Sequence, residues 1–353
     1  MMARALALAA KGLFTTSPNP RVGCVIERGD AIVGEGWHEA AGKPHAEVNA
    51  LEQAGDRARG GTAYVTLEPC SHQGRTPPCA DALIRAGVSR VVAAMQDPNP
   101  QVAGTGFARL QTSGVEVIVG VMEEEARELN VGFVSRMTRG RPWVRLKVAA
   151  SVDGRTALAN GKSQWITGEA ARTDGHRWRA RACAVLTGIG TVRDDDPQLN
   201  VRLVETPRQP LKVLVDSRLE ISPGAKLFND GKVLVFAAEK SPRADVLRAR
   251  GAEVVFMANA RGKVDLPALL EELAHREINE LHIEAGNGLN GSLLMEDCVD
   301  ELLLYFAPTV LGDGAKGMFH MADFAELAQG RRFRFTAAEP VGEDLRVLAR
   351  VLT

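Results

Sequence analysis

Cysteine, aromatic side chains and net charge are all scarce in this chain of 353 residues. Its five cysteines are too few and too scattered for a disulfide scaffold, and they favour a reducing cytoplasm. The net charge of −1 gives no general electrostatic attraction to nucleic acid or to a membrane surface. No apolar run approaches the length of a membrane span. We therefore expect a cytoplasmic protein whose partners are small molecules, and neither nucleic acid nor membrane.

The N-terminus has one feature of a signal peptide, because Arg4 precedes an apolar run. Lys11 interrupts that run, and no cleavage-site pattern follows it. An amphipathic first helix is instead predicted by the apolar spacing of Ala5, Leu6, Ala9 and Leu13.

Strand and helix patterns alternate along the first 140 residues. We expect strands at 22–27, 31–37, 62–68, 89–95 and 115–120. We expect helices at 46–55, 78–87, 106–114 and 123–137. Such alternation predicts a layered α/β domain.

A second α/β series opens at 144–151, after a linker-like RGRP at 139–142. Further strands are expected at 183–188, 211–217, 232–238, 252–258, 280–286, 301–308, 331–340 and 344–352. A chain of this length favours two domains, since single cores rarely exceed roughly 250–300 residues. We place the domains at 1–140 and 144–353, with the boundary near 138–144.

The stretch LEPCSHQGRTPPCADAL, residues 67–83, separates Cys70 and Cys79 more widely than usual for zinc ligands, which commonly lie about two to four residues apart. Upstream, PHAEVNALEQ places His45 and Glu47 at the start of a predicted helix. Helical residues i and i+2 point about 200° apart, so these two cannot chelate one ion together. We expect His45, Cys70 and Cys79 to hold one zinc ion with a fourth position open to water, and Glu47 to lie over that position.

This arrangement suits hydrolytic chemistry. Zinc lowers the pKa of a bound water, and Glu47 could take its proton and pass it to a departing amine. Pro77 and Pro78 favour a helix that begins near Cys79, where the positive helix end stabilises a thiolate. The alternative is that both cysteines are ordinary buried thiols and that His45 caps a helix.

The order H-A-E followed by P-C-x8-C resembles the zinc-dependent nucleobase deaminase signature, apart from the long cysteine spacing. TTSPNPRVGCVI, LEPCSHQGRTPPC and AAMQDPNPQVAG further resemble the deaminase half of the bifunctional riboflavin biosynthesis family, which has this long spacing. LKVAASVDGRTA, SQWITG, TVRDDDPQLNVR and IEAGNGLNGSLL resemble its reductase half. The resemblance covers nearly the whole chain.

The resemblance implies a cytidine-deaminase-like three-layer domain followed by a dihydrofolate-reductase-like α/β domain. The first would hydrolytically deaminate 2,5-diamino-6-ribosylamino-4(3H)-pyrimidinone 5′-phosphate. The second would reduce the ribosyl group to ribityl with NADPH, giving 5-amino-6-ribitylaminouracil 5′-phosphate.

In the second domain, Gly286, Gly288 and Gly291 form a literal G-x-G-x-x-G between a predicted strand and helix. This context suits the approach of backbone N–H groups to a phosphate, although a glycine-rich turn that serves only packing is the alternative. The next strand, ELLLYFAP, ends without the acidic residue that binds the ribose in a Rossmann site, so a standard NAD-binding unit is not expected.

By resemblance, Glu47 is catalytic and the reductase contacts fall into two groups. The cofactor contacts are Ala149, Trp165, Thr191, Asp195, Ser217, Gly286, Asn287, Gly288, Leu289, Asn290, Gly291 and Ser292. The substrate contacts are Ser163, Arg179, Leu199, Arg202 and Glu284. From the filling between the two cysteines, we add the hypothesis that His72 and Arg75 bind the substrate phosphate.

Two other functions compete with this bifunctional one. A nucleic-acid or nucleoside deaminase with an accessory domain would need a way to hold a strand, and the near-neutral charge shows none. A second domain that only senses a ligand would not oxidise NADPH. We prefer the bifunctional deaminase and reductase, and we expect it to form a homo-oligomer.

Overall fold

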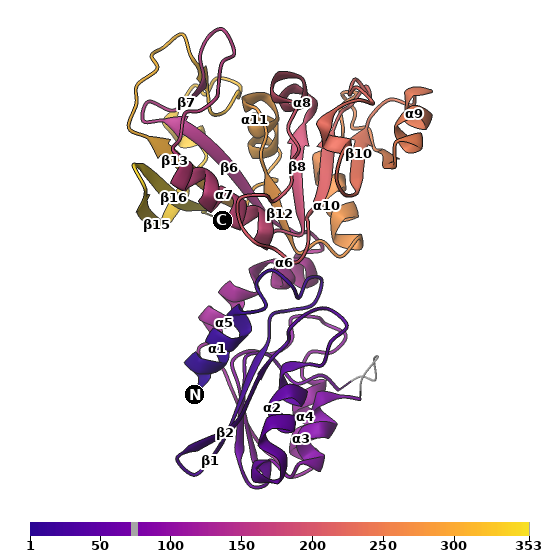
Figure 1. Ribbon diagram of the computed structural model, residues 1–353, viewed down its shortest axis with the longest axis vertical. Coiled ribbons are helices and arrows are strands. Elements are labelled where there is room, and N and C mark those ends of the chain that lie inside the picture. Colours follow the sequence, from indigo (N-terminus) through magenta and orange to yellow (C-terminus); the bar gives the residue numbers. More distant parts are fainter. Residues whose placement is uncertain (72–76, 353) are drawn as a thin grey trace. The chain divides into compact units, whose positions relative to one another are not determined.

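The computed structural model describes residues 1–71 and 77–352. The chain divides into two compact units, Met1–Arg141 and Pro142–Thr353, which are described separately. Figure 1 shows them in indigo to magenta and in magenta to yellow, respectively.

The first unit is built on a five-stranded sheet with the order β2-β1-β3-β4-β5. β1 pairs antiparallel with β2 and β3, whereas β3, β4 and β5 are parallel. The strands are β1 (Gly23–Arg28), β2 (Ala31–Trp37), β3 (Thr62–Val65), β4 (Arg90–Ala93) and β5 (Glu116–Val119).

Helices cover both faces of this sheet (Figure 1). One buried cluster joins α1 (Met2–Ala10) and α5 (Glu123–Leu129) to one face. A second cluster joins the other face to α2 (Ala46–Ala54), α3 (Cys79–Arg85) and α4 (Thr105–Thr112). The three layers agree with the cytidine-deaminase-like architecture that the resemblance implied.

The single helix predicted at 123–137 was wrong. The structure has α5 and a separate α6 (Val131–Arg139), which meet at Asn130. The buried Asn130 side chain accepts a hydrogen bond from the Arg21 backbone N–H and donates one to the Arg21 carbonyl. This tertiary contact holds Asn130 at φ −111° and ψ 23°, which is outside the helical range and interrupts the helix.

The second unit contains a nine-stranded sheet with the order β11-β10-β9-β8-β12-β6-β13-β16-β15. Strands from β11 to β13 are parallel, and β16 and β15 continue the sheet antiparallel. The bounds are β6 (Trp143–Ser151), β8 (Ala184–Gly188), β9 (Leu211–Val215), β10 (Val233–Ala237), β11 (Ala252–Phe256), β12 (Glu280–Ile283), β13 (Glu301–Ala307), β15 (Phe333–Val341) and β16 (Asp344–Val351). A small separate sheet pairs β7 (Arg155–Ala157) with β14 (Lys316–Gly317).

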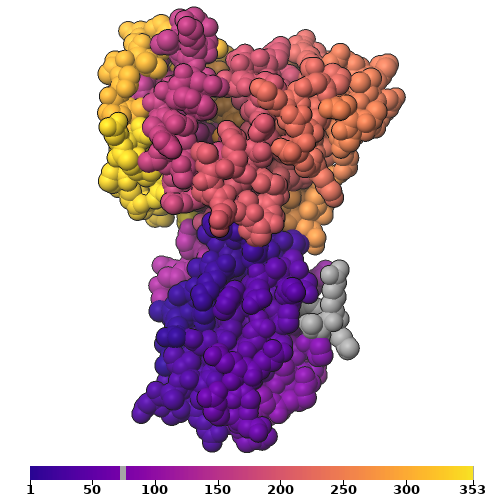
Figure 2. All heavy atoms as spheres, viewed as in Figure 1, coloured from indigo at the N-terminus to yellow at the C-terminus, as the bar shows by residue number. Residues whose placement is uncertain are grey.

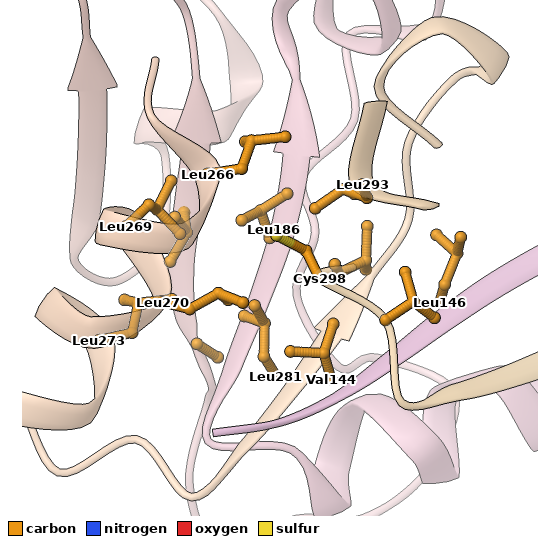
Figure 3. Close-up of a cluster of buried hydrophobic side chains, with 14 of the residues drawn as sticks. Val144, Leu146, Leu186, Leu266, Leu269, Leu270, Leu273, Leu281, Leu293 and Cys298 are labelled. Atoms are coloured by element: carbon orange, nitrogen blue, oxygen red, sulfur yellow. The ribbon is translucent and has the colours of Figure 1, made fainter. Parts of the chain in front are cut away.

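Helices pack on both faces of this sheet as well. The main core lies under α10 (Leu266–His275) and α11 (Asn287–Met295). In Figure 3, leucines of α10 and α11 point toward Leu186 of β8 and Leu281 of β12. The opposite face carries α7 (Glu169–Arg181), α8 (Ile189–Asp195) and α9 (Arg243–Ala249).

Short 3-10 turns occur at η1 (Gly55–Ala58), η2 (Lys226–Phe228) and η3 (Leu327–Gln329). None of the helices described here combines the length and the apolar character that a membrane span requires.

Candidate functional site

Two glycines of β2 bring α2 close to the first sheet. A Cβ atom at Gly36 would lie 2.4 Å from the Ala46 carbonyl oxygen, and one at Gly34 would lie 2.1 Å from that of Ala50. Any larger residue would therefore push α2 outward. This close packing fixes the N-terminus of α2, where His45 is the N-cap residue and Glu47 lies in the first turn.

The two cysteines come from different elements and meet beside His45. Cys70 follows β3 through a short connection, and Cys79 is the first residue of α3. The Cys79 backbone N–H donates to Cys70 Sγ at 3.3 Å, and the Ala80 N–H donates to the Cys70 carbonyl oxygen at 3.1 Å. These hydrogen bonds bring together the two ends of the segment between Cys70 and Cys79. The length of that segment therefore does not separate the two sulfur atoms.

The donor atoms have the spacing that a zinc ion requires. His45 Nδ1 lies 3.6 Å from Cys70 Sγ and 3.3 Å from Cys79 Sγ, and all three donor atoms lie within 4.8 Å of one another. Zinc–sulfur bonds of about 2.3 Å and zinc–nitrogen bonds of about 2.0 Å at tetrahedral angles place such donors about 3.6 Å apart. Two thiolates and one imidazole therefore fit zinc and leave a fourth coordination position open.

Glu47 is held beside these donors and away from solvent, with only 3% of its surface exposed. Burial, together with the charge of Cys70, raises the pKa of Glu47 to about 7. Hydrogen bonds from Cys79 and His45 lower the pKa of Cys70, which favours its thiolate, and the proton shared with Cys70 raises the pKa of Cys79. A carboxyl group with a pKa near neutrality is suited to both accepting and donating a proton.

His38 and Asn19 also border this cluster, and neither was predicted from the sequence. The His38 ring packs edge-on against His45, with ring centroids 5.3 Å apart. Its Nδ1 lies 3.0 Å from the Pro44 carbonyl oxygen, and its Nε2 lies 3.1 Å from Asn19 Nδ2. Because a carbonyl can only accept, Nδ1 donates and Nε2 accepts from Asn19. The sequence feature that could have indicated His38 is its position in GWHE, shortly before the HAE motif.

Glu68, two residues before Cys70, fixes the connection that carries Cys70. Its buried carboxylate accepts hydrogen bonds from the backbone N–H groups of Asp97, Gly104 and Gly106 at 2.8–3.1 Å. The segment that follows β4 is therefore tied to the connection that carries Cys70.

His72 and Arg75 lie outside the described residues.

A cavity of about 1060 Å³ opens in the second unit where its parallel strands end. Figure 2 shows a hollow in the surface there, between the magenta and salmon segments. Carboxyl ends of parallel strands are the usual place for ligands in open α/β sheets. The cavity is lined by most of the predicted contacts, namely Ala149, Ser163, Trp165, Arg179, Thr191, Asp195, Leu199, Arg202, Ser217, Glu284, Gly286, Asn287, Gly288, Leu289 and Ser292.

Glu284 is the centre of a charged cluster at one end of the cavity. Arg179 binds its carboxylate with two donors, one of them at 2.8 Å, and Lys147 Nζ lies 3.9 Å away. Burial alone would raise the pKa of Glu284, but the charge and hydrogen bonds of Arg179 hold it well below its ordinary value. Glu284 is therefore an ionised acceptor between two cations.

Lys147 was also missed in the sequence, where it is a cation in an otherwise largely apolar strand. It projects from β6 into the cavity beside Ala149. Burial lowers the pKa of Lys147, which makes its ammonium proton easier to release.

The entrance of the cavity carries Trp165, which is 66% exposed. The Arg172 guanidinium stacks over its ring at 4.8 Å from the centroid. Nearby, Asp195 Oδ1 accepts hydrogen bonds from Ser163 Oγ at 3.3 Å and from Gln164 Nε2 at 3.4 Å. An aromatic face thus lies next to a polar cluster at the end of α8.

Asn290 and Gly291 are not among the residues that line the cavity, although both were predicted as cofactor contacts. Asn290 is buried and donates to the Met318 carbonyl oxygen at 3.2 Å. A Cβ atom at Gly291 would lie 1.8 Å from the His320 carbonyl oxygen. The G-x-G-x-x-G pattern forms the N-cap and first turns of α11. Its first two glycines line the cavity, and the third permits close packing.

Comparison with known proteins gives two family matches. Residues 1–95 match the model described as the cytidine and deoxycytidylate deaminase zinc-binding region. Residues 142–347 match the model described as the RibD C-terminal domain.

Relatives match over nearly their whole lengths. The riboflavin biosynthesis proteins RibD of Escherichia coli and Haemophilus influenzae are each 47% identical to this chain, covering 98% of it and 96% and 95% of the relatives. The solved structure of Acinetobacter baumannii RibD, form 1, matches with a TM-score of 0.92 and 45% identity, over 100% of this chain and 98% of that one. A Thermotoga maritima structure, titled as a diaminohydroxyphosphoribosylaminopyrimidine deaminase/5-amino-6-(5-phosphoribosylamino)uracil reductase, matches with a TM-score of 0.87 and 34% identity, over 99% and 97%.

Proposed function

The chain belongs to the RibD family of riboflavin biosynthesis proteins, and from this premise we propose which reactions its two sites perform and which residues perform them. It is a bifunctional enzyme with a zinc-binding deaminase domain and an NADPH-dependent reductase domain. We assign the deaminase to residues 1–140 and the reductase to 144–353. The substrate of the first step is 2,5-diamino-6-ribosylamino-4(3H)-pyrimidinone 5′-phosphate, and the product of the second is 5-amino-6-ribitylaminouracil 5′-phosphate.

The observation that supports deamination most strongly is the zinc-compatible triangle of His45, Cys70 and Cys79 beside the buried Glu47. Zinc, when bound, supplies a Lewis acid that makes water nucleophilic near neutral pH. Glu47 accepts a proton from the attacking water and delivers it to the leaving amine, so that water is consumed and ammonia is released. The buried position of Glu47 keeps this proton from exchanging freely with solvent.

Reduction takes place at the Glu284 end of the cavity. NADPH, when bound, supplies the hydride that is transferred to ribose C1′. The C1′–O4′ bond opens, and the electron pair left on O4′ takes up a proton. Lys147 holds a proton at Nζ that can pass to O4′, because burial lowers its pKa. Glu284 orients Lys147 and Arg179.

The remaining cavity residues bind the two ligands. Ser163, Arg179, Leu199, Arg202 and Glu284 contact the phosphorylated substrate, where guanidinium groups suit a phosphate. The cofactor contacts are Ala149, Trp165, Thr191, Asp195, Ser217, Gly286, Asn287, Gly288, Leu289 and Ser292. Asn290 and Gly291 are left out of this set because they do not line the cavity and instead contact Met318 and His320.

We further propose that the protein acts in the cytoplasm as a homo-oligomer. No disulfide joins any of the five cysteines, in keeping with a reducing compartment. The edge strand β15 exposes Phe335 to 73%, and an exposed edge favours pairing with another chain. Light scattering coupled to gel filtration measures the mass of the protein in solution, and a purely monomeric mass would contradict the homo-oligomer.

Product analysis tests the proposed reactions. The diamino substrate is incubated with the enzyme with and without NADPH, and the products are identified by mass spectrometry. Without NADPH the reaction should stop at the deaminated ribosylamino compound, and with NADPH it should proceed to the ribityl compound. Release of ammonia without any NADPH oxidation on the deaminated compound would limit the enzyme to a deaminase.

A further inference from the structure

One end of the cavity is rich in cations that lie away from the Glu284 cluster. Arg218 follows β9, and Arg261 and Lys263 lie on the turn between β11 and α10; all three line the cavity. Glu284 follows β12 and Ser217 follows β9, with β8 between these strands. At about 4.8 Å per strand spacing, the two positions are about 10 Å apart across the sheet. The cavity therefore has a substrate end at β12 and a second, basic end at β9.

The turn that carries Arg261 and Lys263 is held in one shape by Asn259. Asn259 Oδ1 accepts from the backbone N–H groups of Arg261 at 2.9 Å and Lys263 at 3.1 Å. The Asn259 N–H in turn donates to the Lys263 carbonyl oxygen at 2.8 Å. Although their side chains are exposed, the two cations are thus carried by a preformed turn.

Ser217 joins this turn to the sheet and keeps a free donor. Its Oγ accepts the Val264 backbone N–H at 3.2 Å. Because the oxygen acts as the acceptor in this bond, the hydroxyl hydrogen remains available to a ligand in the cavity. A neutral donor therefore lies next to the basic turn.

The charges at this end are poorly compensated by the protein. Over residues 1–71 and 77–352, no carboxylate lies within ion-pair distance of Arg261 or Lys263. Arg218 shares the single carboxylate of Glu220 with Arg193, at 2.6 Å and 3.0 Å. Glu296 also lines this end, where burial raises its pKa and the charge of Arg261 acts against that rise, but the two form no ion pair. An anion is the ligand that this arrangement favours.

We propose that Ser217, Arg218, Arg261 and Lys263 bind the 2′-phosphate of NADPH and so select it over NADH. The inference rests on the proposed function, which places the cofactor in this cavity. With its nicotinamide at the Glu284 end, a dinucleotide laid across the strand ends brings its adenosine to β9. A phosphomonoester carries about −1.5 to −2 charges, which the three cations neutralise, whereas the 2′-hydroxyl of NADH leaves them unpaired.

Binding of adenosine phosphates tests this assignment without requiring turnover. Titration calorimetry compares 2′,5′-ADP with 5′-AMP, which lacks the 2′-phosphate, on the full-length protein. Losing one charge-assisted hydrogen bond costs roughly 10-fold or more in affinity. The triple variant Arg218→Ala, Arg261→Ala, Lys263→Ala should therefore lose about 100-fold or more for 2′,5′-ADP and less than about 3-fold for 5′-AMP. In the same triple variant, the KM for NADPH should rise relative to the KM for NADH.

Lys232→Ala is the matched control, since it also removes an exposed cation. Lys232 lies just before β10, at the amino ends of the parallel strands, whereas the cavity lies at their carboxyl ends. This control variant should leave the ligand ratio unchanged. An unchanged ratio in the triple variant, or an equal loss for both ligands, overturns the proposal. The single variant Lys263→Ala, confirmed as folded by circular dichroism, gives the same test with less change to the turn. If the wild-type protein binds neither NADPH nor 2′,5′-ADP, the assignment of a reductase fails instead.

Discussion

Replacing Glu47 by glutamine should abolish deamination while leaving the rest of the enzyme intact. Glutamine has nearly the same shape but cannot carry a proton from water to amine. General acid–base catalysis contributes about 10²–10⁴-fold. Because Glu47 is only 3% exposed, bulk water cannot readily replace it, so we place the loss in kcat at about 10³–10⁴-fold. This corresponds to about 4–5.5 kcal/mol in the activation free energy.

The assay measures ammonia release, zinc content and NADPH oxidation on the same preparation. Zinc should remain bound, because His45, Cys70 and Cys79 are unchanged. Reduction of the deaminated substrate should continue at the wild-type rate, because the cavity belongs to the second unit. The melting temperature should not fall, since a neutral amide relieves the cost of burying a carboxylate. A deaminase rate within about 10-fold of wild type would refute the role of Glu47 as proton carrier.

Three further predictions address the metal, the packing of α11 and the pH dependence of stability. Cys79→Ser should lose zinc, as measured by elemental mass spectrometry, while NADPH oxidation on the deaminated substrate persists; a retained metal would contradict the assigned ligand set. Gly291→Ala should lower the melting temperature through a cost of about 1–3 kcal/mol, because the new methyl group meets the His320 carbonyl, whereas Gly288→Ala, which meets nothing within 4 Å, should not. His176 accepts the Arg202 N–H through Nδ1, and burial, followed by the nearby arginines, lowers the pKa of His176 to about 4. In the unfolded chain this histidine takes up a proton at about pH 6.5. The contribution of neutral His176 to stability is therefore complete above that pH and is lost as the pH falls toward about 4. When the pH is lowered from about 7 to 5, the melting temperature of His176→Gln should therefore fall less than that of the wild type. Equal falls in the two proteins would contradict this.

The sequence predicted those features that depend on local pattern and spacing. The alternating strands and helices gave the two α/β units, and the order H-A-E and P-C-x8-C identified donors that the structure brings within 4.8 Å. The broken helix at Asn130 was not predictable in this way, because its cause is a hydrogen-bonded contact with Arg21 more than a hundred positions away.

The unforeseen parts of the site share this dependence on distant contacts. Lys147 could not be distinguished from a solvated lysine until β6 and β12 placed it near Glu284. Gly291 belongs to a recognisable motif, yet its neighbour His320 lies in a separate segment, so its packing role was hidden. The basic end of the cavity likewise depends on a turn, held by Asn259, that approaches β9 only in the folded chain.

One chain performs deamination and then reduction, at two separate sites. The direct test of this order uses zinc-free protein, prepared by chelation and given the diamino substrate with NADPH. This mixture should give neither ammonia release nor NADPH oxidation, and the same protein should oxidise NADPH at the wild-type rate when it is supplied with the deaminated substrate. Oxidation of NADPH by the zinc-free protein on the diamino substrate would contradict this order.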